Sequence, residues 1–475
     1  MPIQKRWVVR PNGEKEVVER LATHLRMSPV LTNLLVQRGI DTVEKANKFF
    51  NPQLGDLHDP FLMKDMAKAV ERIERAIANN EKIMVYGDYD VDGTTAVALV
   101  YKFLKQIGHK NLVFYIPDRY NDGYGISVKG IDFAARKGVT LAIALDCGIK
   151  AVEKVVYAKE KGVDFIICDH HLPADEIPAA VAVLDPKRND CNYPFNELSG
   201  CGVGFKLVQA YTQRRGIPMT DICHLLPLLA LSIACDVVPV TGENRILVHY
   251  GLRALNAQPS VGLQAIMHVA GVQERSVNIT DLAFRIGPRI NASGRMKSGA
   301  EAVRLLITDD KQEADQYAQE INNYNQDRRD HDTRTTEEAL AQLEADEENE
   351  NKHTTVVYAP DWHKGVVGIV ASRLTETYYR PTIVLTAGED GIISGSARSV
   401  GGFDIYAAID SCLDLLTNFG GHKYAAGLSM HIDNLPAFCE RFEHYVATHI
   451  REDQLQPTLQ IEAELQLGDI TKQFY

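Results

Sequence analysis

The sequence predicts an α/β protein of two domains, a larger one built on a parallel β-sheet and a smaller α/β one, joined by a long helix. Short apolar runs alternate with helical patterns from residue 81 to about 240, as expected for βαβ units. A highly charged stretch around 300–350 interrupts this pattern, and strand-like runs return from 354. Because 475 residues exceed what one hydrophobic core usually holds, length also favours two domains.

Shifts in composition place the boundaries of these parts. Residues 66–80 repeat apolar side chains at helical spacing, which predicts a helix leading into the first strand. The charged stretch has almost no Gly or Pro and indicates exposed helix that ends in an acidic hinge. We therefore expect an N-terminal helical segment at 1–75, the parallel-sheet domain at 76–300, the connecting helix and hinge at 301–350, the smaller domain at 351–455 and the start of a further region at 456–475.

Apolar runs mark the candidate strands of both domains. In the larger domain they are KIMVYGD (82–88), NLVFYIP (111–117), TLAIALD (140–146), VDFIICD (163–169) and AVAVLDP (180–186), with helical patterns at 96–108 and 131–138. In the smaller domain they are TTVVYAP (354–360), PTIVLTAG (381–388) and GIISGSARS (391–399). Runs of the larger domain end at Asp88, Asp118, Asp146, Asp169 and Asp185. Since the carboxyl ends of parallel strands meet at one ligand-binding edge, these aspartates predict a functional site.

Composition narrows the class of protein. A net charge of -12 argues against a generally basic, DNA-coating surface, although a local basic groove can exist on an acidic protein. The eight cysteines show no C-x-x-C pair, and Cys147, Cys168 and Cys235 lie in apolar, strand-like runs, so we expect free thiols in a reducing cytoplasm. The start lacks a signal-peptide core, and the most apolar stretch, 225–240, is interrupted by Asp236, so we expect a soluble protein without a membrane span.

The stretch YGDYDVDGTT (86–95) places three carboxylates, Asp88, Asp90 and Asp92, where the first strand ends. Like charges this close repel one another unless water or cations separate them, so a divalent metal site is one reading. A solvated Asx-type turn is the alternative. An EF-hand is disfavoured, because no glutamate completes the loop and a helix follows too soon.

Three further stretches add candidate ligands. Asp146 in ALDCGI could cap a turn or bind metal. In IICDHHLP, His170 and His171 follow Asp169, and imidazole beside carboxylate suits Mn²⁺ better than Ca²⁺. The side chains of adjacent residues in an extended chain point in opposite directions, so we expect only one of the two histidines to bind a given metal. The other would contact substrate or orient a carboxylate. A structural role for both histidines is the alternative. Asp236 lies among apolar residues and needs a partner, for which a metal is suitable.

Taken in order, DYDVDGTTA, ALDCGI, DHH and ACDVVPV resemble the four motifs of the DHH phosphoesterase superfamily. PRINASGRM (288–296) and FGGHKYAAG (419–427) resemble its RecJ branch, the second as part of a DHHA1 domain, and PDRYNDGYGI (117–126) and SGCGVGFKL (199–207) fit the same branch. The resemblance extends from about residue 20 to 455. It implies that 76–300 is a DHH catalytic domain, that 351–455 is a DHHA1 substrate-binding domain, and that a cleft lies between them.

The resemblance also implies the chemistry. Members are exonucleases that hydrolyse single-stranded DNA, 5′ to 3′, in repair and recombination, with two Mn²⁺ or Mg²⁺ ions that activate water and stabilise developing charge. The implied metal ligands are Asp90, Asp92, Asp146, His170 and Asp236, with Asp88 and His171 each as a ligand or an outer residue. The implied catalytic set is Asp90, Asp92, Asp146, His170, His171 and Asp236.

Substrate contacts are expected on two stretches. Residues 284–299 carry three arginines and a lysine without an acidic residue, and guanidinium groups suit phosphate oxygens; a plain surface loop is the alternative. The small residues of GGHKYAAG would let a backbone approach a strand end, although a tight turn would look alike. The expected substrate-binding residues are Arg119, Tyr124, Arg289, Asn291, Ser293, Arg295, Arg373, Ser396, Arg398, Gly420, Gly421 and His422.

Other functions remain in view. A DHH phosphodiesterase for short oligonucleotides or cyclic dinucleotides usually has a histidine where this chain has Tyr86, and a non-catalytic scaffold would have lost ligands that this chain keeps. GCGVGF is only a weak signal for dinucleotide binding, and the GK[ST] motif of ATP-binding P-loops is absent from the sequence.

We expect a monomer whose partners are single-stranded DNA and, as candidates, single-strand-binding protein or a helicase. RecJ proteins usually continue into an OB-fold near residue 475, so we expect intact cleavage chemistry with a weaker grip on long strands.

Overall fold

The computed structural model describes residues 4–472 and 474. Two compact units divide the chain. The central unit is Asn47–Gln326, and the terminal unit combines the residues up to Ala46 with those from Asp327 onward. The long helix α15 (Lys311–Ala345) contributes residues to both. The predicted fold class, a parallel-sheet domain with a smaller α/β domain, is confirmed.

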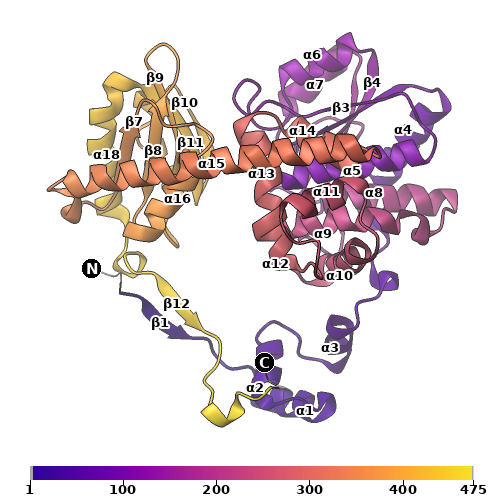
Figure 1. Cartoon of the computed structure of the whole chain (residues 1–475), viewed down its shortest axis with the longest axis horizontal. Coiled ribbons are helices and arrows are strands. Elements are labelled where there is room, and N and C mark those ends of the chain that lie inside the picture. The colour runs from indigo at the N-terminus through magenta and orange to yellow at the C-terminus, as the bar shows by residue number, and fades with distance from the viewer. Residues whose placement is uncertain (1–3, 473, 475) are drawn as a thin grey trace. The chain divides into compact units, whose positions relative to one another are not determined.

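A five-stranded parallel sheet forms the middle of the central unit (Figure 1). Its strands are β2 (Lys82–Gly87), β3 (Leu112–Tyr115), β4 (Val139–Leu145), β5 (Asp164–Cys168) and β6 (Ala182–Leu184), all at predicted runs. The spatial order is β3-β2-β4-β5-β6. The chain therefore adds strands first on one side of β2 and then on the other, which makes the β2/β4 boundary the topological switch point, where doubly wound sheets bind ligands.

Helices cover both faces of this sheet. Alternate residues of β2 separate accordingly, with Ile83 and Val85 in one apolar cluster and Met84 and Tyr86 in the other. The first cluster includes residues of α4 (Met66–Ala78), α5 (Val91–Gln106), α8 (Gly200–Arg215) and α9 (Leu226–Cys235), and the second includes residues of α6 (Val128–Arg136) and α7 (Val152–Glu160). Burial on both faces explains why the strands are apolar throughout.

The remaining helices of the central unit correct one expectation and exclude one alternative. Cys235 ends helix α9 and is not in a strand, because a short apolar run does not distinguish a buried helix from a strand. The 284–299 stretch is helical and not a loop: a π-helical turn (Leu282–Ile286) continues into α13 (Gly287–Met296). The other helices are α10 (Gly242–Ala257), α11 (Val261–Val269), α12 (Ile279–Asp281) and α14 (Gly299–Ile307).

The terminal unit contains a second five-stranded sheet, of order β10-β11-β9-β8-β7. Strands β7 (Thr355–Ala359) and β8 (Thr382–Ala387) are parallel, whereas β9 (Ile392–Arg398), β10 (Asn418–His422) and β11 (Ala425–His431) pair antiparallel. Its helices are α16 (Val367–Tyr378), α17 (Ile405–Asp410) and α18 (Leu435–His449).

The N-terminal residues belong to the terminal unit through a strand pair that the sequence did not predict. Strand β1 (Arg6–Val9) pairs in parallel with β12 (Thr458–Ile461), and helices α1 (Lys15–Leu25), α2 (Pro29–Val36) and α3 (Val43–Phe50) follow β1. None of the described helices combines the length and apolarity that a membrane span requires.

Candidate metal centre

Acidic and imidazole side chains meet at the carboxyl edge of the parallel sheet. Asp88 and Asp146 follow β2 and β4, the two strands that flank the switch point, and His170 follows β5. Donor atoms within 4.8 Å of one another form three groups among the described residues: Asp88, Asp90 and Asp146; Asp92, His170 and Asp236; and Asp146, His170 and His171. All six predicted metal ligands are thus brought together within one unit.

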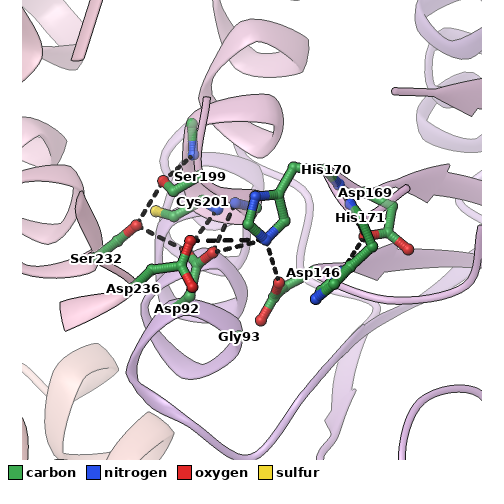
Figure 2. A network of polar contacts seen from close by, with 12 residues as sticks. Asp92, Gly93, Asp146, Asp169, His170, His171, Ser199, Cys201, Ser232 and Asp236 are labelled. Atoms are coloured by element: carbon green, nitrogen blue, oxygen red, sulfur yellow. Dashed lines mark hydrogen bonds and ion pairs between the residues drawn. The ribbon is translucent and has the colours of Figure 1, made fainter. Parts of the chain in front are cut away.

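The groups meet at Asp146 and His170. Figure 2 shows the His170 imidazole surrounded by carboxylates from three separate chain segments. Its Nε2 atom lies 3.2 Å from Asp146 Oδ1 and 3.7 Å from both Asp92 Oδ2 and Asp236 Oδ2. Asp146 links the Asp88–Asp90 group to the histidines, and His170 links Asp146 to the group with Asp92 and Asp236, so the three groups adjoin one another.

Two helix N-termini hold the aspartates of the first motif. Asp90 caps α5, and its side chain accepts a hydrogen bond of 3.0 Å from Gly93 N. Asp92 accepts hydrogen bonds from Gly200 N (2.6 Å) and Cys201 N (2.8 Å) in the first turn of α8, and from Ser232 Oγ (2.7 Å). Unpaired N–H groups at a helix start favour a carboxylate, so these contacts fix the orientation of the Asp92 side chain.

Close packing explains the small residues of these motifs. A Cβ atom on Gly93 would lie 2.5 Å from Asp88 N and O, and one on Gly200 would lie 2.5 Å from Asp146 Cβ. Asp146 itself adopts a positive φ of 59°, a conformation that Asp tolerates better than most residues. The chain therefore turns sharply after β4. The backbone segments at Asp88, Asp146 and Gly200 lie close to their neighbours, which brings the acidic side chains together.

Burial and mutual repulsion dominate the electrostatics. Burial first, and then neighbouring aspartates, raise the pKa of Asp88, Asp90 and Asp146 above the ordinary value. The same causes raise the pKa of Asp236 to about 8. Asp88 Oδ1 and Asp236 Oδ2 are buried and have no hydrogen-bond partner among the described residues. Buried carboxylates in this condition need a proton or a cation.

The two histidines differ in their surroundings. Burial lowers the pKa of His170, which favours the neutral imidazole that binds metals. Burial opposes protonation of His171 too, but its hydrogen bond to Asp169 and the Asp169 charge raise the His171 pKa overall. The His171 Nδ1 to Asp169 Oδ1 distance is 2.7 Å, and the His171 Nε2 atom lies 3.2 Å from the Tyr124 hydroxyl.

The donor set fits divalent cations. It combines carboxylate oxygens with imidazole nitrogen, a mixture suited to Mn²⁺ and accessible to Mg²⁺. A cation would compensate the repulsion that raises the aspartate pKa values and would give the partnerless oxygens a ligand. The residues present therefore accommodate such ions.

The expected substrate-binding residues of the central unit differ in their exposure and in the contacts that they make. The Arg119 guanidinium lies 4.5 Å from the centre of the Tyr89 ring, and Asn291 Oδ1 accepts a hydrogen bond of 3.1 Å from Val91 N. Asn291 thus positions the start of α5 through its carbonyl. Ser293 is fully buried and donates to the Ile290 carbonyl, which leaves no exposed hydroxyl for the phosphate contact expected from sequence.

The arginines of α13 also make internal contacts. Arg289 Nε donates to Asn322 Oδ1 (3.0 Å), and its terminal nitrogens donate to the Arg285 and Val269 carbonyls. These bonds fix the direction of the Arg289 guanidinium. The backbone carbonyl of Arg295 accepts a hydrogen bond of 2.7 Å from the Tyr120 hydroxyl, which ties the 117–126 loop to this helix.

Expected substrate residues of the terminal unit gather around its sheet. Arg398 donates to Ser396 Oγ (2.7 Å) on strand β9, and Arg373 donates to Asp332 Oδ2 (2.8 Å). His422 is exposed where β10 ends. In the same strand, Gly421 has a φ of 154°, and a Cβ there would lie 2.4 Å from Ala425 O, whereas Gly420 has open space around it.

The sequence did not reveal two residues, Asp169 and Ser199, that hold segments of the metal centre in place through hydrogen bonds. Asp169 was noted as a strand end but was assigned no role; its carboxylate accepts hydrogen bonds from the backbone N–H groups of Ile149, His170 and His171 as well as from His171 Nδ1. Ser199 caps α8 and contacts Ser232 Oγ at 2.6 Å. The SGCG stretch carried a helix N-cap signal that could have revealed this second support.

Two protein families match the sequence. Residues 82–233 match the DHH family, N-terminal domain, and residues 351–448 match the DHHA1 domain. Curated relatives include the single-stranded-DNA-specific exonuclease RecJ of Bacillus subtilis, 38% identical over 98% of this chain, and that of Dickeya dadantii, 34% identical over 97% of this chain. The chain spans 58% of the first relative's length and 81% of the second's.

Solved structures agree with these matches. The structure of RecJ from Thermus thermophilus in complex with Mn²⁺ is 30% identical, with a TM-score of 0.82, and covers 96% of this chain and 64% of its own. An exonuclease RecJ bound to manganese is 33% identical, with a TM-score of 0.74, over 84% of this chain and 97% of its own.

Proposed function

This chain belongs to the RecJ family of DHH proteins, and on that basis we propose that it is a metal-dependent exonuclease that hydrolyses the phosphodiester bonds of single-stranded DNA. The observation that carries the proposal is the convergence of Asp88, Asp90, Asp92, Asp146, His170 and Asp236 at the switch point of the sheet. The names of the relatives supply the substrate, and the geometry supports the reaction type.

The cofactors in this proposal are two divalent ions, Mn²⁺ or Mg²⁺. Related structures hold Mn²⁺ and Mg²⁺, and the adjoining donor groups, one with Asp88 and Asp90 and one with Asp92 and Asp236, offer ligands for a pair of ions. Such a pair activates water and stabilises charge on the attacking and leaving oxygens. Asp92 is held for this purpose by the start of α8, and Asp169 keeps the His171 ring in place.

We propose that side chains of each unit contact the polymer. Arg119 and Tyr124 lie on the loop after β3, and Tyr124 contacts His171 directly, so a nucleotide at the metals would meet both. Ser396, Arg398 and His422 of the terminal unit are proposed to bind a strand end. Digestion from 5′ to 3′, a monomeric state, action in repair and recombination, and association with single-strand-binding protein or a helicase belong to the same proposal.

One rival function is hydrolysis of short oligonucleotides or cyclic dinucleotides. Relatives of that class usually place a histidine where this chain has Tyr86. Here Tyr86 is buried in the sheet, and its hydroxyl donates to the Gly125 carbonyl (2.7 Å), so it supports the 117–126 loop and does not face a metal. That observation favours the exonuclease.

The test is an end-labelled assay on a long single strand, its duplex form and a dinucleotide. We expect Mn²⁺- or Mg²⁺-dependent digestion of the single strand, loss of activity in EDTA, and little digestion of the duplex. Asp146→Ala should lower the rate about 100-fold or more, because two of the three donor groups lose a carboxylate oxygen. Asp132→Asn, on helix α6 outside the centre, is the matched control. A faster reaction on the dinucleotide, or an Asp146→Ala variant with full activity, would refute the proposal.

A further inference from the structure

An exposed phenylalanine lies on the helix beside the metal centre. Phe284 is the middle residue of the π-helical turn Leu282–Ile286, and its side chain is 76% exposed. The flanking Leu282 and Ile286 are buried in the core, so the turn is anchored on one side and displays the ring on the other. Turns of this type occur often at functional sites.

This turn packs against the segment that carries Asp236. The Sγ atom of Cys235 lies 3.6 Å from the Leu282 carbonyl oxygen, and a Cβ on Gly287 would lie 2.3 Å from that sulfur. Farther along the same helix, Asn291 bonds to Val91 N, between two ligands of the first motif. The stretch from Leu282 to Asn291 therefore runs along the side of the metal centre.

The immediate surroundings of Phe284 carry surplus positive charge. The Asp281 carboxylate accepts a bidentate interaction from Arg275, one bond of which is 2.8 Å, and also lies 3.5 Å from Arg285 Nε. Two guanidinium groups thus share one carboxylate. In a chain of net charge -12, this local excess complements a polyanion.

A second exposed apolar side chain follows the ligand itself. Val237 is 85% exposed and has a φ of 59°, a left-handed conformation that is unfavourable for a β-branched residue. A glycine would adopt this conformation at lower cost, so a valine there indicates that the apolar side chain is useful.

Single exposed apolar residues are common and need no explanation. The combination here is specific: an aromatic ring on an anchored turn, arginines beside it, and the segment of the candidate ligand Asp236 in contact with the turn. We propose that Phe284 stacks on a nucleobase of the strand whose phosphate lies at the metal centre, with Arg285 on the adjoining phosphate and Val237 against the sugar. This inference rests on the proposed exonuclease function and adds a base-contacting subsite to it.

Stacking on an aromatic ring suits this reaction for two reasons. Every base has a flat face, so the contact tolerates any sequence, as an exonuclease requires. Bases inside a duplex are stacked on both neighbours and offer no free face to Phe284. The subsite would therefore favour single strands.

The test compares Phe284→Ala, Phe284→Leu and Phe284→Tyr on a single-stranded oligonucleotide. We expect Phe284→Ala to raise KM about tenfold, or about 1.4 kcal/mol, with a small effect on kcat. Phe284→Tyr should restore KM because the ring returns, and Phe284→Leu should not. Phe50→Ala, which removes another exposed ring of the central unit, is the matched control and should behave as the wild type.

An abasic strand completes the experiment. With bases removed from the first few nucleotides, wild type and Phe284→Ala should have equal KM values, because the stacking partner is gone. An unchanged KM in Phe284→Ala, restoration by leucine, or a persistent difference on the abasic strand would overturn the inference. A wild-type protein that digests no single strand would instead refute the proposed function, so the two failures are distinguishable.

Discussion

Asp169 shows how one carboxylate can organise a centre without belonging to it. Its oxygens accept three backbone N–H groups and the His171 ring, and these hydrogen bonds, with the His171 charge, outweigh burial and keep the Asp169 pKa below the ordinary value. The residue therefore fixes the turn that presents both histidines. From sequence, His170 and His171 are recognisable as candidate ligands because imidazole is a common metal ligand. The role of Asp169 depends on hydrogen bonds that the sequence does not reveal, among them the one from Ile149 N, twenty residues earlier in the chain.

Replacing Asp169 with asparagine tests this positioning role. Asp169→Asn keeps the shape but exchanges one acceptor oxygen for an NH₂ donor, which conflicts with the N–H groups that it faces. We expect Mn²⁺ affinity to fall about 10- to 100-fold, in line with other residues that orient metal ligands. We also expect the His171 pKa to fall towards its ordinary value. Calorimetric titration and NMR titration of the histidines measure the two effects, and Asp132→Asn serves as control; unchanged Mn²⁺ affinity would contradict the assignment.

The raised aspartate pKa values predict an unusual pH dependence for the metal-free protein. Burial and the charges of Asp92 and Asp90 raise the Asp236 pKa from 3.8 to about 8 in the folded state. Between these values the folded protein holds a proton that the unfolded chain has released, so the stabilising contribution present at low pH is lost as pH rises towards 8.

Thermal unfolding in EDTA therefore should show a lower Tm at pH 8 than at pH 6. Added Mn²⁺ should reverse this trend, because a cation replaces the proton and binds better as the carboxylates ionise. Asp236→Asn, which cannot ionise, should flatten the pH dependence in EDTA. A metal-free Tm that rises steadily from pH 6 to pH 8 would show that other groups dominate.

Among elements, the strands were easier to predict from sequence than the helices around the site. The runs that form β2, β4 and β5 are apolar and end in aspartate, and their parallel arrangement alone predicts that Asp88, Asp146 and Asp169 share an edge. Strand order is a property of tertiary packing and could not be read from the runs. Helix α13 was missed because its Gly, Pro and Asn residues have poor helix propensity, which packing against Tyr89 and Cys235 overrides.

The start of α8 offers a test at this scale. Gly200→Ala would place a methyl group 2.5 Å from Asp146 Cβ, whereas Gly202→Ala in the same turn meets its nearest atoms at 3.4 Å. We expect Gly200→Ala to displace α8 from Asp146, to cost about 1–3 kcal/mol of stability and to weaken Mn²⁺ binding at least about tenfold. Gly202→Ala should change both quantities much less, as urea unfolding and metal titration would measure. Equal effects of the two substitutions would mean that helix propensity, and not the contact with Asp146, is responsible.

At the scale of the whole molecule, the sequence predicts two domains, but it does not predict the strand pair that joins the first residues to the last part of the chain. The terminal unit unites the first 46 residues with the last part of the chain, and the register of β1 with β12 pairs Arg6 with Thr458. Both strands have only four residues; β1 is exposed throughout and β12 is exposed except for the half-buried Ile461, so they carry little periodic signal. The site residues that form donor groups all come from one unit, so local motifs sufficed to find them.

Separate cores predict that metal stabilises one part of the molecule only. Buried clusters of the central and terminal units share no residue, and every candidate donor group among the described residues lies in the central unit. Calorimetry should then resolve two transitions in EDTA. Mn²⁺ at 100 times its Kd should add about 2.7 kcal/mol to the central unit, which raises that transition by roughly 5 °C and leaves the other in place. Asp146→Ala should abolish the shift while both transitions persist, and a metal-induced rise of both transitions together would show that the units unfold as one.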